Sequence, residues 1–204
     1  MSLDVGNTLV TSAEPGLATL LTRATKPSAL LDEALALLHT RTTTQPLFDE
    51  ICARLAIQPM NLARYRPPEP IVMPGVVEGL ALLRTLDVRV VSLSNVASID
   101  AGPLPAIVND YLDAQYQSFR LGAAKPDAAA FSSMLQAEAV DPHTGVHIGD
   151  SWRCDALGAL SAGMSTIWLQ PQAGAPAPPP HEGLVVVSSF SEAVETLVRC
   201  INDD

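Results

Sequence analysis

Four stretches that are far apart in the sequence each place a chemically capable residue next to an apolar run. These residues are Asp4, Ser94, Lys125 and Asp150, and Asp155 follows five positions after the last of them. In an open parallel sheet, ligands bind beyond the carboxyl ends of the strands. If the apolar runs are such strands, the five side chains meet at one edge of the sheet. Converging carboxylates repel one another and need a cation, and oxygen ligands without His or Cys neighbours suit Mg²⁺.

This set of residues also suits the chemistry of a phosphoryl group. A lysine and a hydroxyl beside Mg²⁺ would neutralise the charge of a phosphoryl group and donate hydrogen bonds to it. An aspartate aimed at the phosphorus can attack it and form an aspartyl phosphate. Phosphoryl transfer asks mainly for positioning and charge neutralisation, which this set supplies. The residues alone predict an anion and Mg²⁺ site more firmly than they predict any one reaction.

The elements that must position these residues alternate between strands and helices. The apolar patterns predict strands over 88–93, 114–118, 145–148, 165–169 and 184–188, and helices over 76–86, 127–138, 155–162 and 191–200. A very short first strand precedes Asp4. Alternation of this kind predicts an α/β fold, a Rossmann-like parallel sheet with helices on both faces. Five prolines between Pro171 and Pro180 predict an extended surface loop.

A helical run interrupts this alternation after the first strand. Its apolar residues recur at helical spacing, Ser28 is a plausible N-cap and Pro46 could open a third helix. The stretch from Pro67 to Pro70 forbids regular structure and suggests a hinge. We therefore expect a small α-helical cap at 14–69, inserted into an α/β core formed by 1–13 and 70–204.

Composition excludes several classes of partner. The 204 residues are 48 % hydrophobic, and their formal net charge is −10. An acidic chain argues against nucleic acid and anionic membranes as partners. The chain has no apolar window long enough to span a bilayer, no secretory signal pattern and no cysteine pairing framework. We expect a cytoplasmic protein that acts on a small metabolite, a monomer by default, although apolar cap surface could serve a dimer.

The motifs, in order, resemble those of the haloacid dehalogenase superfamily, subfamily I, in which a C1-type helical cap is inserted into the core. The matching segments are Asp4-Val5-Gly6-Asn7-Thr8-Leu9, Ser94-Asn95, Lys125-Pro126-Asp127 and Gly149-Asp150 with Asp155. The resemblance covers nearly the whole chain. It implies a Mg²⁺-dependent hydrolase, of phosphatase type, that acts on a small phosphorylated metabolite.

The resemblance also implies a role for each matching position. Asp4 corresponds to the nucleophile and a Mg²⁺ ligand, Ser94 to the hydroxyl that binds the phosphoryl group, and Lys125 to the cation between them. Asp150 corresponds to a Mg²⁺ ligand and Asp155 to a ligand or its supporting partner. Further expected contacts are the Gly6 carbonyl with Mg²⁺, the Asn95 amide with the phosphoryl group, Thr8 as support for the loop, and Arg153 with substrate.

One position departs from the pattern of the superfamily's phosphatases. They carry a second aspartate two residues after the nucleophile, which protonates the leaving group, and this chain has Gly6 there. The substrate could have a good leaving group, such as an acyl phosphate, or a cap residue such as His39 could supply the proton. Alternatively, the chain is a catalytically impaired protein that binds phosphorylated ligands. The superfamily branch that this chain most resembles also lacks that aspartate.

Other readings of single residues fit the pattern less well. A lysine in the cap could form a Schiff base, as in phosphonatases, but Lys26 lies in an accessible loop between two predicted helices. A dehalogenase would not need the metal-binding pair Gly149-Asp150. His147, within a predicted strand, is expected to be a packed core residue.

Overall fold

The computed structural model describes residues 1–170 and 180–203. Its centre is a six-stranded sheet in the order β5-β4-β1-β6-β7-β8, in which all paired neighbours are parallel. The strands are β1 (Ser2–Leu3), β4 (Val91–Ser94), β5 (Ala114–Gln117), β6 (Val146–Gly149), β7 (Ser165–Leu169) and β8 (Leu184–Val187). Their residues are largely apolar because both faces of the sheet are covered. The predicted α/β fold is therefore confirmed.

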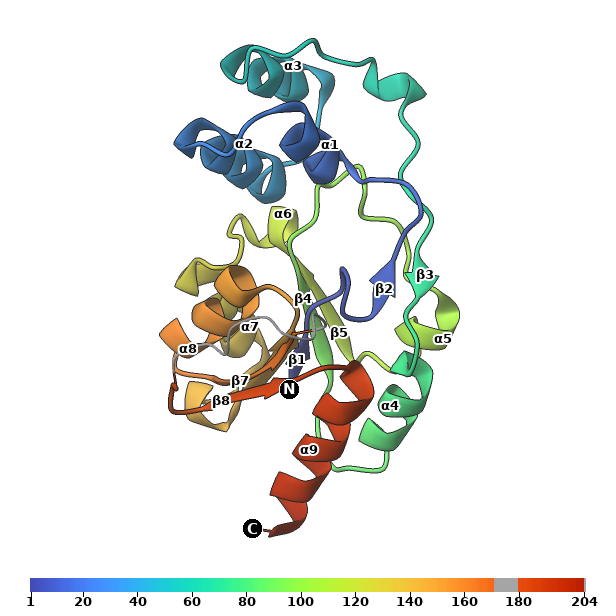
Figure 1. Ribbon diagram of the computed structural model, residues 1–204, viewed down its shortest axis with the longest axis vertical. Helices are drawn as coiled ribbons and strands as arrows, with labels where there is room; N and C mark the ends of the chain where they lie inside the picture. The colour runs from blue at the N-terminus through green and yellow to red at the C-terminus, as the bar shows by residue number, and fades with distance from the viewer. Residues whose placement is uncertain (171–179, 204) are drawn as a thin grey trace.

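Helices cover both faces of this sheet (Figure 1). One apolar cluster joins the sheet to α4 (Val76–Leu83), α5 (Ala106–Asn109) and α9 (Phe190–Asp203). A second cluster joins it to α7 (Ala128–Glu138) and α8 (Gly158–Ser161). Two short helical pieces, α6 (Ser118–Leu121) and the 3₁₀ turn Pro142–Thr144, complete this part of the chain.

A helical insert, defined here as residues 17–64, forms the upper part of the molecule (Figure 1). It contains α1 (Leu17–Ala24), α2 (Ala29–Thr40), α3 (Gln45–Arg54) and the 3₁₀ turn Leu62–Arg64. Ser28 caps α2 by accepting a hydrogen bond from the backbone N–H of Leu31, and Pro46 lies in the first turn of α3, as predicted. The insert has its own apolar cluster, to which Ala97 of the core also belongs.

Two chain segments connect the insert to the core, and they pair with each other. β2 (Val10–Thr11) and β3 (Ile71–Val72) form a two-stranded antiparallel ladder between the first strand and α4. The segment from Pro67 to Pro70, which was predicted to lack regular structure, therefore leads directly into β3, which is paired with β2.

The remaining differences from the sequence-based prediction are local. The helix expected from 155 onward begins earlier, as a π-helix over Trp152–Leu157 that continues into α8. The short helices α5 and α6 were not predicted, since each has only four residues. Most of the predicted proline-rich loop, residues 171–179, lies outside the described residues. Among the described helices, none has the length and apolar character needed to cross a bilayer.

Candidate active site

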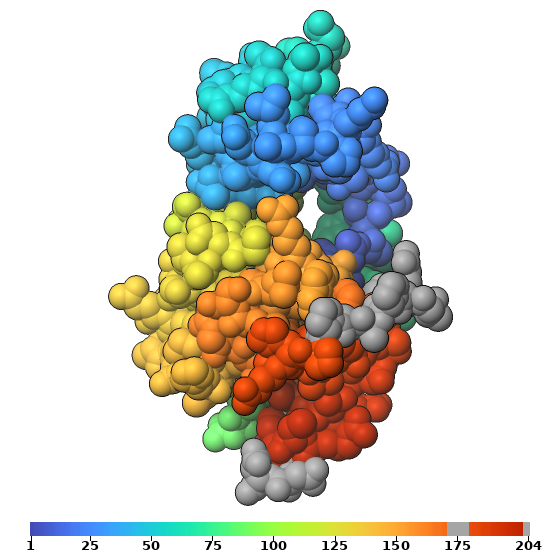
Figure 2. Space-filling view, turned by 60° about the vertical axis from the view of Figure 1, so that its left-hand side comes forward, coloured from blue at the N-terminus to red at the C-terminus, as the bar shows by residue number. Residues whose placement is uncertain are grey.

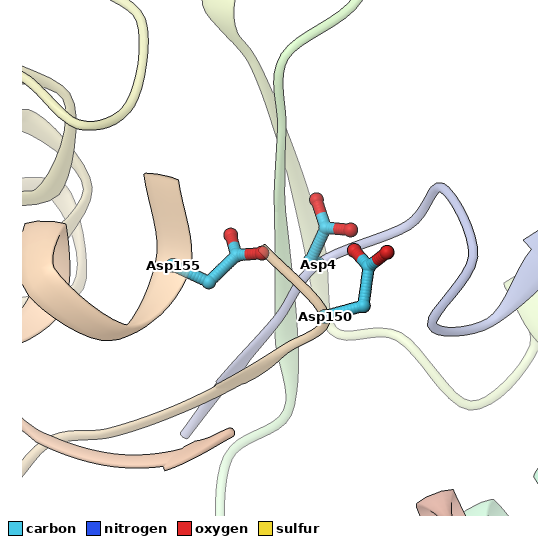
Figure 3. Close-up of side chains that lie close together, drawn as sticks. All are labelled: Asp4, Asp150 and Asp155. Atoms are coloured by element: carbon cyan, nitrogen blue, oxygen red, sulfur yellow. The ribbon is translucent and has the colours of Figure 1, made fainter. Parts of the chain in front are cut away.

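Three of the predicted aspartates meet at the carboxyl edge of the sheet. Asp4 follows β1, Asp150 follows β6, and Asp155 lies in the π-helix Trp152–Leu157. One carboxylate oxygen from each lies within 4.8 Å of the others, and Figure 3 shows the three carboxylates gathered above the strand ends. They converge because β1 and β6 are parallel neighbours, with Leu3 opposite Ile148. Clustered carboxylate oxygens form a hard donor set, which fits Mg²⁺.

Lys125 bridges two of these carboxylates. Its Nζ lies 2.6 Å from Asp4 Oδ1 and 2.6 Å from Asp155 Oδ1, and its side chain is 1 % exposed. Burial by itself lowers the pKa of Lys125, but the two adjacent carboxylates outweigh burial and raise it. Lys125 therefore remains a cation, although it is buried.

The side chain of Asn95 holds the main chain of Lys125. Asn95 Oδ1 accepts a hydrogen bond from the Lys125 backbone N–H at 2.8 Å, and its Nδ2 donates to the Lys125 carbonyl at 2.7 Å. The predicted contact of Asn95 was with the phosphoryl group. That contact stays a prediction, and the side-chain bonds give Asn95 a further role that sequence reasoning missed, which is to fix the backbone of Lys125.

Asp155 is the best-satisfied carboxylate of the three. Its Oδ1 accepts hydrogen bonds from Lys125 and from His147 Nε2 at 3.1 Å, and its Oδ2 accepts one from the Ser151 backbone N–H at 2.8 Å. Burial raises the pKa of Asp155, but Lys125 and His147 outweigh it and hold the pKa well below its usual range. Asp155 is thus an ionised, fixed partner for Lys125.

Asp4 has fewer stabilising partners. Among the described residues, its side chain accepts hydrogen bonds from Lys125 and, at 3.4 Å on Oδ2, from the Thr8 hydroxyl, so that Thr8 touches the nucleophile candidate itself. Burial, opposed by Lys125 and reinforced by Asp155, raises the pKa of Asp4 to about 7. The pKa of Asp150 is also raised, by burial and by Asp155. A divalent cation would therefore favour the ionised form of both groups.

Ser94 lies at the same edge of the sheet as Asp4. It is the last residue of β4, and the register that pairs Leu3 with Ser92 brings the ends of β4 and β1 together. Ser94 is partly buried at this edge, and its contact with a phosphoryl group stays a prediction.

Two glycines shape the site in opposite ways. A Cβ added at Gly149 would lie 2.4 Å from Asp155 Cγ, so only glycine allows Asp155 to approach β6 this closely. A Cβ added at Gly6 would meet no atom within 4 Å, and Gly6 is not among the residues with a left-handed backbone. The loop at Gly6 therefore has room for a Cβ, the first atom of the aspartate that the resemblance leads one to expect.

The helical insert reaches the core near this site. Arg153 Nη1 lies 3.6 Å from Asp32 Oδ1 of α2, with both side chains mostly exposed. In Figure 2 the orange segment after β6 meets the blue insert, with an opening beside it. Thus the structure pairs Arg153, a predicted substrate contact, with the insert.

His39 does not suit the role of proton donor at neutral pH. It is the next-to-last residue of α2, and burial lowers the pKa of His39 to about 4. A general acid must hold its proton at the working pH. At pH 7, His39 is neutral and has no such proton to give.

Asp100, which the sequence analysis did not single out, ties the core to the first residue of the insert and to the residue directly after its end. Its Oδ2 accepts a hydrogen bond from the Leu17 backbone N–H at 2.7 Å, and its Oδ1 accepts one from Tyr65 Oη at 2.6 Å. The signal in sequence was weak, since an aspartate in a loop after a strand is common.

Comparison with known proteins supports this assignment of the fold and the family. A family model described as haloacid dehalogenase-like hydrolase matches residues 2–163. "Haloacid dehalogenase-like hydrolase domain-containing protein 3" of Mus musculus is 35 % identical over 57 residues, which are 28 % of this chain and 23 % of the mouse protein. The aligned segment thus spans about a quarter of that relative.

Solved structures resemble the fold along nearly its whole length. A 2-haloacid dehalogenase from Pseudomonas syringae pv. Tomato DC3000 has a TM-score of 0.64 at 22 % identity, covering 98 % of this chain and 97 % of that chain. A HAD phosphatase from Thermococcus onnurineus has a TM-score of 0.63 at 20 % identity, covering 96 % of both chains. The L-2-haloacid dehalogenase of Xanthobacter autotrophicus, with chloropropionic acid covalently bound, has a TM-score of 0.63 at 18 % identity, covering 97 % of both.

Proposed function

We propose that this chain, which belongs to the haloacid dehalogenase-like hydrolases, is a Mg²⁺-dependent phosphatase of a small phosphorylated metabolite. The observation that carries the proposal is the cluster in which Lys125 bridges Asp4 and Asp155 while Asp150 lies beside them. Three carboxylates against one ammonium leave an excess of negative charge that a divalent cation would balance. Asp4, Asp150 and the main chain at Gly6 would hold Mg²⁺, which when bound would neutralise charge on the phosphoryl oxygens.

In the proposed reaction an oxygen of Asp4 attacks the phosphorus. The bond from phosphorus to the leaving group breaks, and the leaving group departs with the electron pair, which gives an aspartyl phosphate. Lys125 holds the attacking carboxylate in place, and the Ser94 hydroxyl donates a hydrogen bond to the phosphoryl group. Water then attacks the phosphorus of the intermediate, releasing inorganic phosphate and restoring the Asp4 carboxylate.

Gly6 narrows the range of substrates that this mechanism would turn over. No side chain at that position can protonate a leaving group, and His39 is unprotonated at neutral pH. The leaving group of an acyl phosphate is a carboxylate, which needs no proton to depart. We therefore favour a substrate whose leaving group is a weak base.

We further propose that the helical insert is a C1-type cap. Its contacts with the loop after β4 support this, since the Thr43 backbone N–H donates to Ser98 Oγ at 2.6 Å and Leu17 donates to Asp100. Ser98 and Asp100 lie only a few residues after Ser94 in this loop. A cap in this place would exclude water and set specificity.

The alternative is a protein that binds phosphorylated ligands with little turnover, and the observation in its favour is Gly6. The phosphatase and the binding protein differ in whether they turn over a phosphorylated substrate. Acetyl phosphate and an alkyl phosphate should be assayed with and without Mg²⁺, for wild type, Asp4→Asn and, as a matched control, the exposed Asp141→Asn. Hydrolysis of acetyl phosphate that needs Mg²⁺ and is lost only in Asp4→Asn supports the phosphatase.

Two other results, from this assay combined with a phosphate-binding measurement and from a chloride-release assay, would reject the proposal. Absence of turnover, with inorganic phosphate still bound by wild type, would favour the binding protein. Chloride release from 2-chloropropionate in the absence of Mg²⁺ would instead identify a dehalogenase.

A further inference from the structure

His147 is a buried polar residue that links the first strand to the charged cluster, which is the group formed by Asp4, Lys125, Asp150 and Asp155. It lies on β6 with 0 % exposure, and its ring meets Phe131 of α7 edge-on, with the centroids 5.2 Å apart. Its Nδ1 lies 2.8 Å from Ser2 Oγ on β1, and its Nε2 lies 3.1 Å from Asp155 Oδ1. Both ring nitrogens are thus satisfied by side chains, and one of these partners is the carboxylate that holds Lys125.

Asp155 fixes the direction of the two hydrogen bonds that the His147 ring makes. Asp155 is ionised, so its oxygens only accept, and the proton between the two groups must sit on His147 Nε2. This holds whether the ring is neutral or charged. Burial lowers the pKa of His147, which favours the neutral ring. In the neutral ring Nδ1 is an acceptor, and the Ser2 hydroxyl donates to it.

Asp155 Oδ1 is therefore held from two sides. Lys125 donates to it at 2.6 Å and His147 donates to it at 3.1 Å, while the Ser151 backbone fixes Oδ2. Without the His147 donor, one side of a carboxylate that is 2 % exposed would lose its partner. The carboxylate would then be held by Lys125 and the Ser151 backbone alone, which would weaken the anchor that keeps Lys125 beside Asp4.

We propose that His147, oriented by Ser2, is a positioning residue that fixes Asp155 and thereby holds Lys125 against Asp4. The inference rests on the proposed function only for its effect on turnover. The geometry itself can be tested in the resting protein, so a failure of the phosphatase proposal would not hide a failure of this one.

The first test observes Lys125 directly by ¹⁵N NMR of its ammonium group. The chain has only two lysines, and the other, Lys26, is exposed, so one signal protected from solvent exchange identifies Lys125. We expect this signal in wild type and in His147→Gln, whose amide can donate in place of Nε2. We expect it to broaden or vanish in His147→Leu.

The matched control is Thr166→Val. Thr166 is buried on the neighbouring strand β7 and donates to the His147 carbonyl at 3.1 Å, so its loss removes a buried hydrogen bond without touching the charged cluster. The Lys125 signal should persist in this variant. Its persistence in a folded His147→Leu protein would overturn the proposal, and so would its loss in Thr166→Val.

The second test uses the imidazole nitrogens and turnover. The ¹⁵N shifts of His147 should show the proton on Nε2, and a ring protonated only on Nδ1 would overturn the proposal. If wild type hydrolyses acetyl phosphate, His147→Leu should lower kcat about 10- to 100-fold, as loss of an outer partner commonly does, with KM nearly unchanged. His147→Gln should restore most of kcat, and Ser2→Ala should lower it less than His147→Leu does. Equal kcat in folded wild type and His147→Leu would overturn the proposal.

Discussion

Substitution Gly6→Asp would supply the general acid that this site lacks. Gly6 lies two residues after Asp4, on the turn that leads from β1 to β2, and a Cβ there meets no atom within 4 Å. Its backbone is outside the left-handed region, whereas the next residue, Asn7, has a φ of 56°. The backbone at residue 6 therefore accepts a Cβ without rebuilding the turn.

The size of the effect follows from what a general acid contributes. Protonation of a leaving group typically accelerates a reaction about 10²- to 10⁴-fold, which corresponds to roughly 3–5 kcal/mol of barrier. The new carboxyl would join three others, of which Lys125 contacts two, so its pKa should be raised, as a general acid requires. We expect kcat/KM for an alkyl phosphate to rise about 100-fold, and that for acetyl phosphate to rise less than about tenfold, since its leaving group needs no proton.

The assay compares the two substrates at saturating Mg²⁺ for wild type and three variants. Gly6→Ala controls for the change in backbone freedom, and Gly6→Asn has nearly the shape of the aspartate without its proton. Thermal unfolding confirms that each variant is folded. An equal gain in Gly6→Asn, or equal gains for both substrates in Gly6→Asp, would refute the reasoning that only an acid is missing.

Four further predictions concern the charges and the packing of the site. The folded pKa of Asp4 is about 7 against 3.8 for an unperturbed aspartate, so between these values the metal-free folded protein binds more protons than the unfolded chain. In EDTA, the Tm of wild type relative to that of Asp4→Asn should therefore fall as pH rises from about 4 to 7, and a difference in Tm that does not change with pH would contradict this. Mg²⁺ binding near pH 6.5 should release protons, which calorimetry in two buffers measures, and binding without proton release would contradict this second prediction. Gly149→Ala should force Asp155 away from β6, because the new Cβ would lie 2.5 Å from Asp155 Oδ2. In urea titration we expect the unfolding free energy to fall by about 1–3 kcal/mol, and we expect turnover to be lost. An unfolding free energy equal to that of wild type would show that the π-helix can shift to make room. Breaking the exposed pair of Arg153 and Asp32 by Asp32→Asn should change stability by less than about 1 kcal/mol in the same titration, and a larger change would mean that the pair holds the insert in place.

The convergence of Asp4, Asp150 and Asp155 could be predicted from sequence because it depends on a rule of topology. The carboxyl ends of parallel strands share one edge, so polar residues after apolar runs must come near one another. The helices of the insert could be predicted for local reasons, since Ser28 and Pro46 mark helix starts by their own chemistry.

The partners of His147 could not be predicted in the same way. Its place within a strand indicated burial, but its contact with Ser2 depends on the register between β1 and β6, where these two residues lie opposite each other. Its contact with Asp155 depends on the π-helix, in which the Ala156 N–H bonds to the Ser151 carbonyl five residues earlier. Register and helix type are set by tertiary packing, which no residue spacing in the sequence records.

The charges of the site predict that the two proposed ligands, Mg²⁺ and a phosphoryl group, bind cooperatively. Lys125 is already paired with Asp4 and Asp155, so the lysine of this cluster is not free to neutralise an entering phosphoryl group, which also faces the negative charge of Asp150. A divalent cation reverses this balance, because it screens Asp150 and Asp4 and leaves Lys125 able to share its protons with the phosphoryl oxygens. Anion affinity should therefore depend on Mg²⁺, and by linkage Mg²⁺ affinity should rise in the presence of phosphate by the same factor. This reciprocity holds for the phosphatase and for the binding protein alike, so it tests the charge arrangement independently of turnover.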